Sequence, residues 1–353
     1  MTSVLDELAV PIVQAPMAGG PSTPALAAAV SGAGGLGFVA AGYKTAGAMR
    51  EDIVQTRAAT DRPFGVNLFV PGSEPADPAA VAAYAERLEP EARRAGVALG
   101  TPRFDDDDFD AKLAALRDER VAVVSFTFGC PSARVVDDLR RLGTAVWVTV
   151  TDAREARVAA GAGADALVVQ GVEAGGHRGS FADREDRVDY GLLALLALVS
   201  AAVDLPLVAA GAIATGEAVA AVLVAGAAAA QVGTAFMRCP EAATTPEHRA
   251  ALQSARATEL TRAFSGRLAR GIVNRLQAEH TAAAPIAYPE IHHLTAPLRA
   301  HGRGVGDPDL YNLWAGQTHE LAQEAPAAEI VARLHRDARR ALRDGQRKLP
   351  DVL

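Results

Sequence analysis

The feature that most constrains the fold is a regular alternation of short apolar runs with alanine-rich stretches between Pro11 and Thr234. The apolar runs have the length and composition of buried strands, and the stretches between them have helical composition. Eight strands in strict alternation with helices favour a closed α/β barrel, the TIM (β/α)8 fold, over an open doubly wound sheet. The predicted strands are residues 11–15, 36–41, 64–69, 121–126, 145–150, 165–170, 206–210 and 229–232.

Unusual residues follow the ends of these predicted strands. Right-handed crossovers make the strands parallel, so the loops after their carboxyl ends gather on one face, which is the active face of such barrels. Asn67, Gln170, His177, Gly211 and Gly233 all lie at or just beyond a strand end. We therefore expect the functional site on that face.

The last barrel helix comes late in the chain. About ninety residues separate Thr234 from the helix predicted at residues 327–343, far more than an ordinary loop. We predict a mostly helical lid with helices at residues 246–257, 268–278 and 288–299, a glycine-rich turn at 302–306, and the segment WAGQ at 314–317. The predicted division is a barrel of residues 1–236 and 325–353 and a lid subdomain of residues 237–324.

Composition narrows the classes of function. The net charge of -7 argues against broad binding of nucleic acid, and no apolar segment is long enough to span a membrane. Cys130 and Cys239 lie far apart and lack metal-site spacing, which fits a reducing cytoplasm. The acidic run 105–108 is interpreted as a solvated loop, and we expect no metal site. The sequence predicts no particular oligomeric state.

His177 follows Gly175 and Gly176 directly after the sixth strand. Glycines let a backbone turn tightly or approach a ligand, and imidazole suits proton transfer near neutral pH. Taken alone, such a histidine is more often an ordinary loop residue. Asn67 and Gln170 are polar within apolar strands, so they need hydrogen-bond partners from the fold or from a ligand.

The seventh and eighth strands end in glycine-containing turns. Backbone N–H groups beside helix starts favour an anion there, and barrels often bind phosphate at these two loops. We predict a phosphate site at Gly211, Ala212, Gly233 and Thr234, although glycines also permit close packing. Walker A, HExxH and GxSxG motifs are absent, and the glycines at 34–37 (GGLG) form a helix-to-strand turn, not a nucleotide-binding GxGxxG loop. These exclusions leave a phosphate-bearing organic cofactor, and flavin mononucleotide (FMN) fits.

Several segments in this order resemble the flavin-dependent nitronate monooxygenases, formerly called 2-nitropropane dioxygenases. They are QAPMAGG (14–20), GVNLF (65–69), EAGGHRG (173–179), AAGAIATG (209–216) and QVGTAF (231–236), followed by FSGRLARG and WAGQ. The resemblance implies an FMN barrel with phosphate at the two glycine turns and His177 on the substrate side of the flavin ring. The flavin contacts that it implies are the Ala15, Pro16 and Met17 backbone, Asn67, Gln170, Gly175 and Gly176.

The implied reaction oxidises an alkyl nitronate with O2 to a carbonyl compound and nitrite, by single-electron transfer through FMN. His177 could attract the anion when protonated, or remove the α-proton of a neutral nitroalkane when neutral. Thr127 stands where members of the family often carry a histidine, which bears on substrate range. Tyr288 is a candidate lid contact to the substrate.

Two other functions remain open from the sequence. The AGGH loop is also similar to that of FMN- and NAD(P)H-dependent enoyl-acyl-carrier-protein reductases. A barrel that binds flavin or another phosphate ligand without catalysis is the second alternative.

Overall fold

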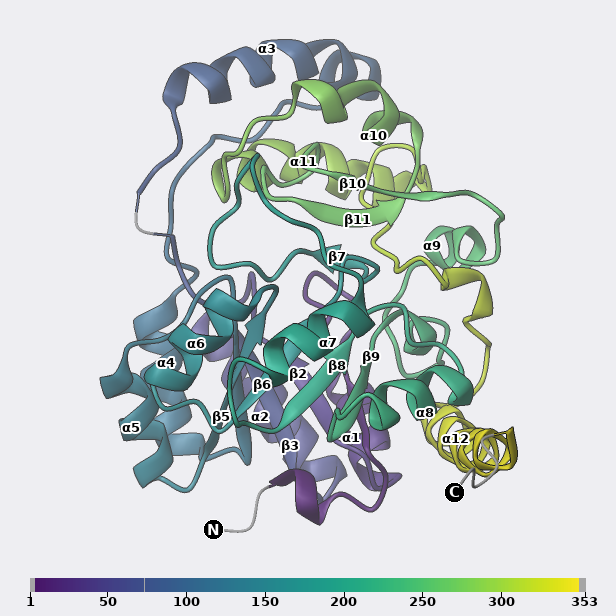
Figure 1. Ribbon diagram of the computed structural model, residues 1–353. Helices are drawn as coiled ribbons and strands as arrows, with labels where there is room; N and C mark the ends of the chain where they lie inside the picture. The colour runs from purple at the N-terminus through teal and green to yellow at the C-terminus, as the bar shows by residue number, and fades with distance from the viewer. Residues whose placement is uncertain (1–3, 73, 349–353) are drawn as a thin grey trace.

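A computed structural model describes residues 4–72 and 74–348. Eight parallel strands form the barrel expected from the sequence, with helices around it (Figure 1). The strands are β1 (Ile12–Gln14), β2 (Gly37–Ala40), β3 (Phe64–Phe69), β4 (Val123–Thr127), β5 (Ala145–Val150), β6 (Ala166–Gln170), β8 (Leu207–Ala210) and β9 (Ala229–Val232).

Only a few backbone hydrogen bonds close the barrel between β1 and β2. Gln14 N donates to Leu36 O at 2.8 Å, and Leu36 N donates to Ile12 O at 3.0 Å. The buried Gln14 side chain extends this seam, because its Oε1 accepts from Phe38 N at 2.8 Å. A side-chain amide thus replaces a missing rung of the β-ladder.

Short polar side chains start most barrel helices. Thr23, Thr45, Ser132, Asp152 and Thr215 each accept a hydrogen bond from the N–H three residues further on, which satisfies a donor that the helix leaves unpaired. The outer helices are α1 (Pro24–Gly32), α2 (Ala46–Ala59), α4 (Phe109–Glu119), α5 (Ala133–Arg141), α6 (Ala153–Gly161), α7 (Leu192–Ser200), α8 (Gly216–Val224) and α12 (Ala327–Lys348).

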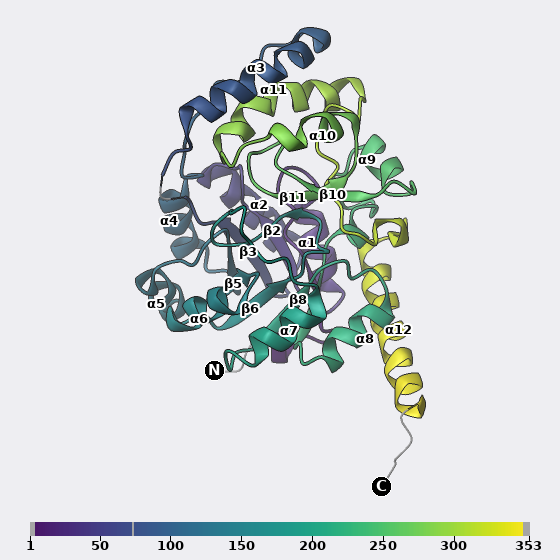
Figure 2. The ribbon, with the colours of Figure 1, turned by 45° about the horizontal axis from the view of Figure 1, so that its top comes forward.

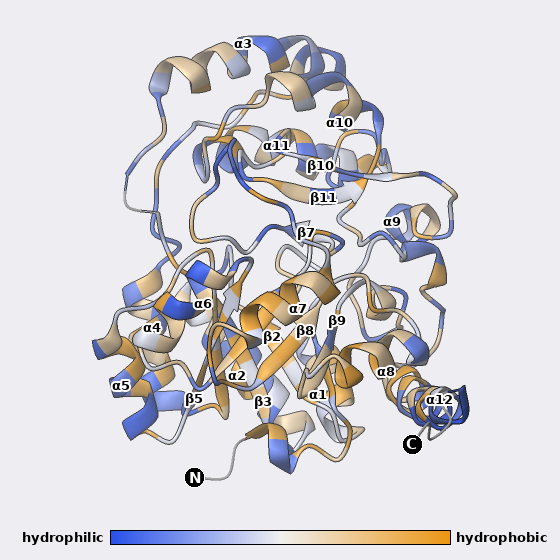
Figure 3. Ribbon diagram, in the orientation of Figure 1, coloured by the Kyte–Doolittle hydropathy of each residue, from blue (hydrophilic) through white to orange (hydrophobic). Residues whose placement is uncertain are grey.

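Side chains fill the barrel interior. Phe38 and Trp147 are buried with ring centroids 5.8 Å apart. Gly65 on the neighbouring strand leaves room, because a Cβ there would lie 2.3 Å from the Phe38 ring. Figure 3 shows the hydrophobic residues concentrated on the barrel strands and on α7. Among the helices within residues 4–72 and 74–348, none is both long and apolar enough for a membrane crossing.

The lid covers one end of the barrel (Figures 1 and 2). It contains α9 (Pro246–Ala251), α10 (Arg275–His280) and α11 (Glu290–Val305), and α3 (Pro78–Ala95) packs against α11 through Tyr84 and Leu88. It also contains an antiparallel sheet in the order β10 (Thr258–Thr261), β11 (Ala269–Ile272), β7 (Gly176–His177). The subdomain boundaries proposed from sequence stay a prediction.

Three expectations about local structure were wrong. Residues 269–272 form β11 instead of helix, because they pair with β10 and β7, and the helix starts only at Arg275 after its Asn274 cap. Residues 302–305 continue α11, which ends at Gly306 in a left-handed conformation (φ 71). The acidic run is not simply solvated, because Asp107 pairs with the buried Lys112 at 2.7 Å and accepts from Tyr43 N at 2.8 Å.

Candidate functional site

A cavity of about 570 Å³ lies at the carboxyl ends of the barrel strands, beneath the lid. The predicted site residues converge there from loops far apart in the sequence. Tyr288 does not line the cavity, but its ring centroid lies 6.0 Å from that of His177. The predicted residues that do line it are Ala15, Pro16, Met17, Asn67, Thr127, Gln170, Gly175, Gly176, His177, Gly211, Ala212, Gly233 and Thr234.

His177 is fixed by the small lid sheet. It pairs with Ala269 of β11, and its backbone oxygen accepts from Gln170 Nε2 at 3.0 Å. Its ring Nε2 lies 2.8 Å from Ser265 Oγ. Burial, together with the positive charges of Arg267 and Arg299, lowers the pKa of His177 to about 3. The imidazole is therefore neutral at physiological pH.

Aromatic rings surround this imidazole. The ring centroids of Phe128, Tyr288 and Trp314 lie 5.7, 6.0 and 5.4 Å from that of His177, all in edge-to-face arrangements. Phe128 is held in a left-handed backbone conformation (φ 77) with Arg267 stacked 4.0 Å over its ring. These rings shield the histidine from bulk water, which explains the direction of its pKa shift.

The two side-chain amides predicted to contact flavin differ in how many of their atoms already have hydrogen-bond partners in the chain. Asn67 Nδ2 donates to Ser125 Oγ at 2.9 Å and to Thr127 Oγ1 at 3.0 Å, and it also reaches Ser125 O at 3.2 Å. Its Oδ1 accepts no hydrogen bond within the described residues, and Asn67 lines the cavity, so this oxygen is available to a ligand donor. Gln170 Oε1 already accepts from Gly179 N at 2.8 Å and holds the His177 loop.

The turns after β8 and β9 expose backbone donors. Gly211 (φ 149) and Ala212 (φ 49) have positive φ angles, and Thr234 begins a short 3-10 helix, η2 (Thr234–Phe236). In the described part of the chain, the N–H groups of Gly211, Ala212, Gly233 and Thr234 have no hydrogen-bond acceptor. Unpaired N–H groups in such a concave turn suit an anion such as phosphate.

The WAGQ segment closes the site from the lid side. Gly316 N donates to Thr234 Oγ1 at 3.0 Å, and Gln317 N donates to Glu173 O at 3.1 Å. A Cβ on Gly175 would lie 2.5 Å from the Ala315 carbonyl carbon. Close approach of this segment is therefore one reason for glycine at position 175.

Sequence reasoning missed the lid-side wall of the cavity. Tyr43 has a positive φ of 67 and stacks on His292 of α11, with ring centroids 4.1 Å apart. Arg299 and Arg303 follow on the same helix and also line the cavity. An arginine in an amphipathic helix carries no sequence signal that distinguishes a cavity position from a surface position.

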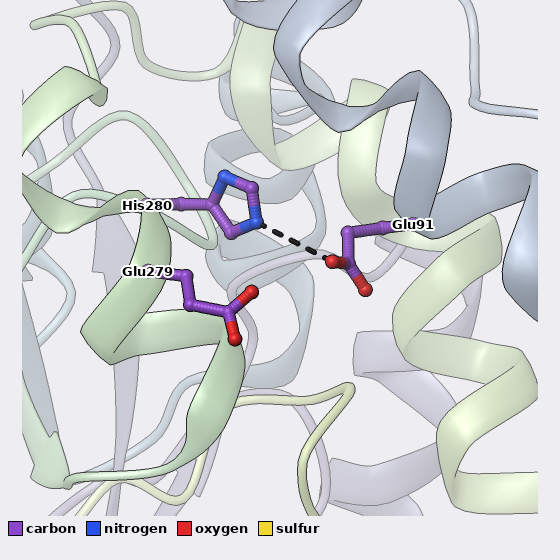
Figure 4. A group of neighbouring side chains, drawn as sticks. All are labelled: Glu91, Glu279 and His280. Atoms are coloured by element: carbon purple, nitrogen blue, oxygen red, sulfur yellow. Dashed lines mark ion pairs between the residues drawn. The ribbon is translucent and has the colours of Figure 1, made fainter.

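A second cluster of ligand-type side chains lies outside the cavity, between α3 and α10 (Figure 4). Glu91 and His280 are buried, and the His280 Nε2 to Glu91 Oε1 distance is 3.7 Å. Both Glu91 oxygens already accept from Arg275, at 2.9 and 2.8 Å, and Arg94 adds a further contact. Because arginines compensate these carboxylates, we describe the cluster as an ion-pair network that joins α3 to α10.

Known proteins are similar to this chain in sequence and in fold. A model of the nitronate monooxygenase family matches residues 2–337. The chain belongs to the nitronate monooxygenase family. A nitronate monooxygenase of Pseudomonas aeruginosa is 43% identical over 340 residues, covering 93% of this chain and 96% of the relative.

Solved structures of similar proteins show the same architecture. Nitroalkane oxidase from Streptomyces ansochromogenes superposes with a TM-score of 0.95 at 50% identity, over 98% of this chain and 100% of that one. FabK from Thermotoga maritima is more distant, with a TM-score of 0.77 at 26% identity over 99% and 100% of the two chains. As a nitronate monooxygenase family member, the chain is a flavin-dependent oxidoreductase.

Proposed function

We propose that the chain binds FMN and oxidises alkyl nitronates, and neutral nitroalkanes, with O2 to a carbonyl compound and nitrite. The observation that carries the proposal is that a neutral His177 lines the same cavity as a group of backbone N–H donors without acceptors, those of Gly211, Ala212, Gly233 and Thr234. The family indicates a flavin, and we propose that this flavin is FMN. We also propose that the protein is cytoplasmic.

The described residues fit FMN at two separate points. The four unpaired N–H groups at Gly211, Ala212, Gly233 and Thr234 would hold the phosphate, and Asn67 Oδ1 would accept from a ring N–H. The backbone of Ala15, Pro16 and Met17, the Gln170 amide and the loop at Gly175 and Gly176 would lie beside the ring. When bound, the flavin supplies the electron transfer between substrate and O2.

His177 would act as the general base that removes the substrate α-proton. Ser265 Oγ donates to Arg267 O at 3.2 Å, so it can accept from the His177 Nε2–H at 2.8 Å. That tautomer leaves a lone pair on Nδ1 to take the α-proton of a neutral nitroalkane. Attraction of a nitronate anion would come from Arg299, which keeps its charge, and not from an imidazolium.

The aromatic rings and the lid would exclude water from the reaction. Phe128 and Trp314 lie against His177 and line the cavity, and the Tyr288 ring lies behind them, beside His177 but outside the cavity lining. Thr127 would act mainly through Asn67, because its Oγ1 accepts a hydrogen bond from the Asn67 side-chain amide.

Anaerobic mixing of the purified protein with each reductant tests the proposal. The nitronate of nitroethane should bleach the flavin rapidly, and air should then yield nitrite. Rapid bleaching by NADH with no response to nitronates would instead support the reductase alternative, to which the similarity with FabK is relevant. A colourless protein that FMN cannot reconstitute would refute both functions. Mass spectrometry of the released cofactor distinguishes FMN from other flavins.

A further inference from the structure

A short segment of the lid lies across the loops that carry the predicted flavin contacts. It runs from Trp314 to Thr318, and we call it the clasp. Trp314 forms an antiparallel bridge with Gly271 of β11, which joins the clasp to the lid sheet. The residues that follow cross to the loops after β6, β8 and β9. The lid therefore contacts the flavin loops directly through this segment.

The clasp donates a hydrogen bond to each of these three loops. Thr318 Oγ1 donates to Ala212 O at 2.7 Å, in the turn after β8. Gly316 N donates to Thr234 Oγ1 at 3.0 Å, after β9. The backbone N–H between these two clasp residues donates to Glu173 O at 3.1 Å, in the loop after β6. Three loops that leave separate strands are thus held to one another.

The contact from Thr318 matters most, because it holds a strained turn. Ala212 has a φ of 49, a left-handed conformation that a residue with a Cβ rarely adopts. Such a conformation persists only where neighbouring contacts hold it. Within residues 4–72 and 74–348, the Thr318 hydroxyl is the one group that donates to Ala212 O. Thr318 therefore helps to keep Ala212 in this conformation.

The turn that Thr318 holds also carries unpaired donors. A trans peptide unit has its C=O and N–H on opposite sides, so the bond to Ala212 O turns the Ile213 N–H away from Thr318. In the described part of the chain, the N–H groups of Gly211, Ala212 and Ile213 have no acceptor, and all three residues line the cavity. Donors that are already in place lose less conformational freedom when an anion binds. The clasp thus prepares this turn for an anion.

We propose that the clasp sets how tightly the protein holds the phosphate of its flavin, and that Thr318 is the positioning residue for the turn at Ala212. Thr318 acts through the backbone of that turn and is not itself a phosphate ligand. This inference rests on the proposed function, because it requires a flavin that carries a phosphate.

Two flavins with the same ring test the clasp in the full-length protein. FMN carries the phosphate and riboflavin lacks it, and fluorescence titration gives the dissociation constant of each. Thr318→Val keeps the shape of the side chain but removes its hydroxyl. It should raise the dissociation constant of FMN about tenfold and change that of riboflavin by less than about twofold. Thr318→Ser keeps the hydroxyl and should bind FMN within about threefold of wild type.

Thr144→Val is the matched control. Thr144 is buried and its Oγ1 donates to Val121 O at 2.8 Å, directly before β5 and outside the cavity lining. This variant therefore loses the same kind of hydrogen bond at a distance from the flavin loops. Both valine variants should unfold at a lower temperature than wild type, but only Thr318→Val should reduce the preference for FMN over riboflavin.

Three results would overturn the inference. The first is an equal loss of affinity for both flavins in Thr318→Val, which would mean that the clasp acts on the flavin ring or on the lid as a whole. The second is an unchanged dissociation constant of FMN in that variant. The third is a wild-type protein that binds riboflavin as tightly as FMN.

These titrations need no nitronate, so they separate the clasp from the proposed activity. A preference for FMN that depends on Thr318, in a protein that oxidises no nitronate, would refute the activity and support the clasp. Nitronate oxidation by a protein whose flavin affinities do not respond to Thr318→Val would support the activity and refute the clasp.

Discussion

The pKa of His177 determines how the reaction responds to acid. In the folded protein it lies near 3, far below its ordinary value of 6.5, because the ring is buried beside Arg267 and Arg299. We expect kcat/KM for nitroethane to show no enzyme ionisation near 6.5 in a pH profile. The same shift costs stability as the pH falls from 6.5 towards 3, because the unfolded chain then binds a proton that the folded chain excludes.

A profile that loses activity with an apparent pKa near 6.5 would contradict this assignment. His177→Asn is the companion variant. It should lower turnover of neutral nitroethane by about 100-fold or more, since general-base catalysis contributes on that order. Turnover of the preformed nitronate should fall much less, because that substrate has already lost its proton.

Asn67 is expected to contribute to flavin affinity. Asn67→Leu keeps the side-chain volume but removes the free Oδ1 and leaves the acceptors on Ser125 and Thr127 unpaired. Flavin titration of the apoprotein should give a dissociation constant about tenfold or more higher than that of wild type. Thr127→Val removes only one of the amide's acceptors and should change affinity about threefold at most. Equal effects of the two variants would place Asn67 in a structural role alone.

Site residues could be predicted from sequence where they stand at the ends of apolar strands. Asn67, Gln170 and His177 were found because polar residues at the ends of apolar strands are conspicuous. Tyr43 and Arg303 could not be found in this way. Their place at the cavity depends on how α11 crosses the barrel mouth, which no local pattern specifies.

At the scale of elements, the join between α3 and α10 depends on Arg275. Arg275→Ala should lower the free energy of unfolding by about 1–3 kcal/mol, since the buried Glu91 loses its bidentate partner. Arg57→Ala, which breaks a surface pair with Glu119, should cost about 1 kcal/mol or less. Urea unfolding measures both.

Acid should reduce the difference between these variants. Hydrogen bonds and charge from Arg275 hold the pKa of Glu91 below its ordinary value of 4.5. The pair therefore stabilises the folded chain above pH 4.5, and this contribution is lost as the pH falls through the lower, folded-state pKa. An Arg275→Ala effect that persists in strong acid would show that packing, not the ion pair, is responsible.

Elements were predictable where their partners were near in sequence. All eight barrel strands were predicted within about two residues of their bounds, the usual accuracy for strongly patterned segments. The lid sheet was missed because β11 is strand only through its pairing with β7 and β10, and residues 268–278 alone have helical composition. Tertiary pairing overrides local propensity in such segments.

At the scale of the whole molecule, α12 returns from the lid to complete the helical shell. Figure 2 shows it beside α8. Ile330, Val331 and Leu334 bury it against the barrel. The insertion of a subdomain before the last helix was predictable from length alone, because the segment between Thr234 and Ala327 is longer than any ordinary loop. The packing of α3 against the lid was not predictable, since its sequence is that of any amphipathic barrel helix.

The α8–α12 contact depends on the absence of a side chain at Gly216. A Cβ there would lie 2.5 Å from both Ala338 N and Asp337 Cβ, so Gly216→Ala must push α12 away from the barrel. We expect a loss of about 1–3 kcal/mol in unfolding free energy, typical of overpacking. Gly345→Ala is the matched control on α12, where a Cβ meets no atom within 4 Å, and should stabilise by up to about 1 kcal/mol. Because α8 starts just after the turn at Gly211 and Ala212, Gly216→Ala should also release flavin at a lower temperature, which flavin fluorescence during heating would detect. Unchanged melting with unchanged flavin release would mean that α12 is not needed to hold the phosphate turns in place.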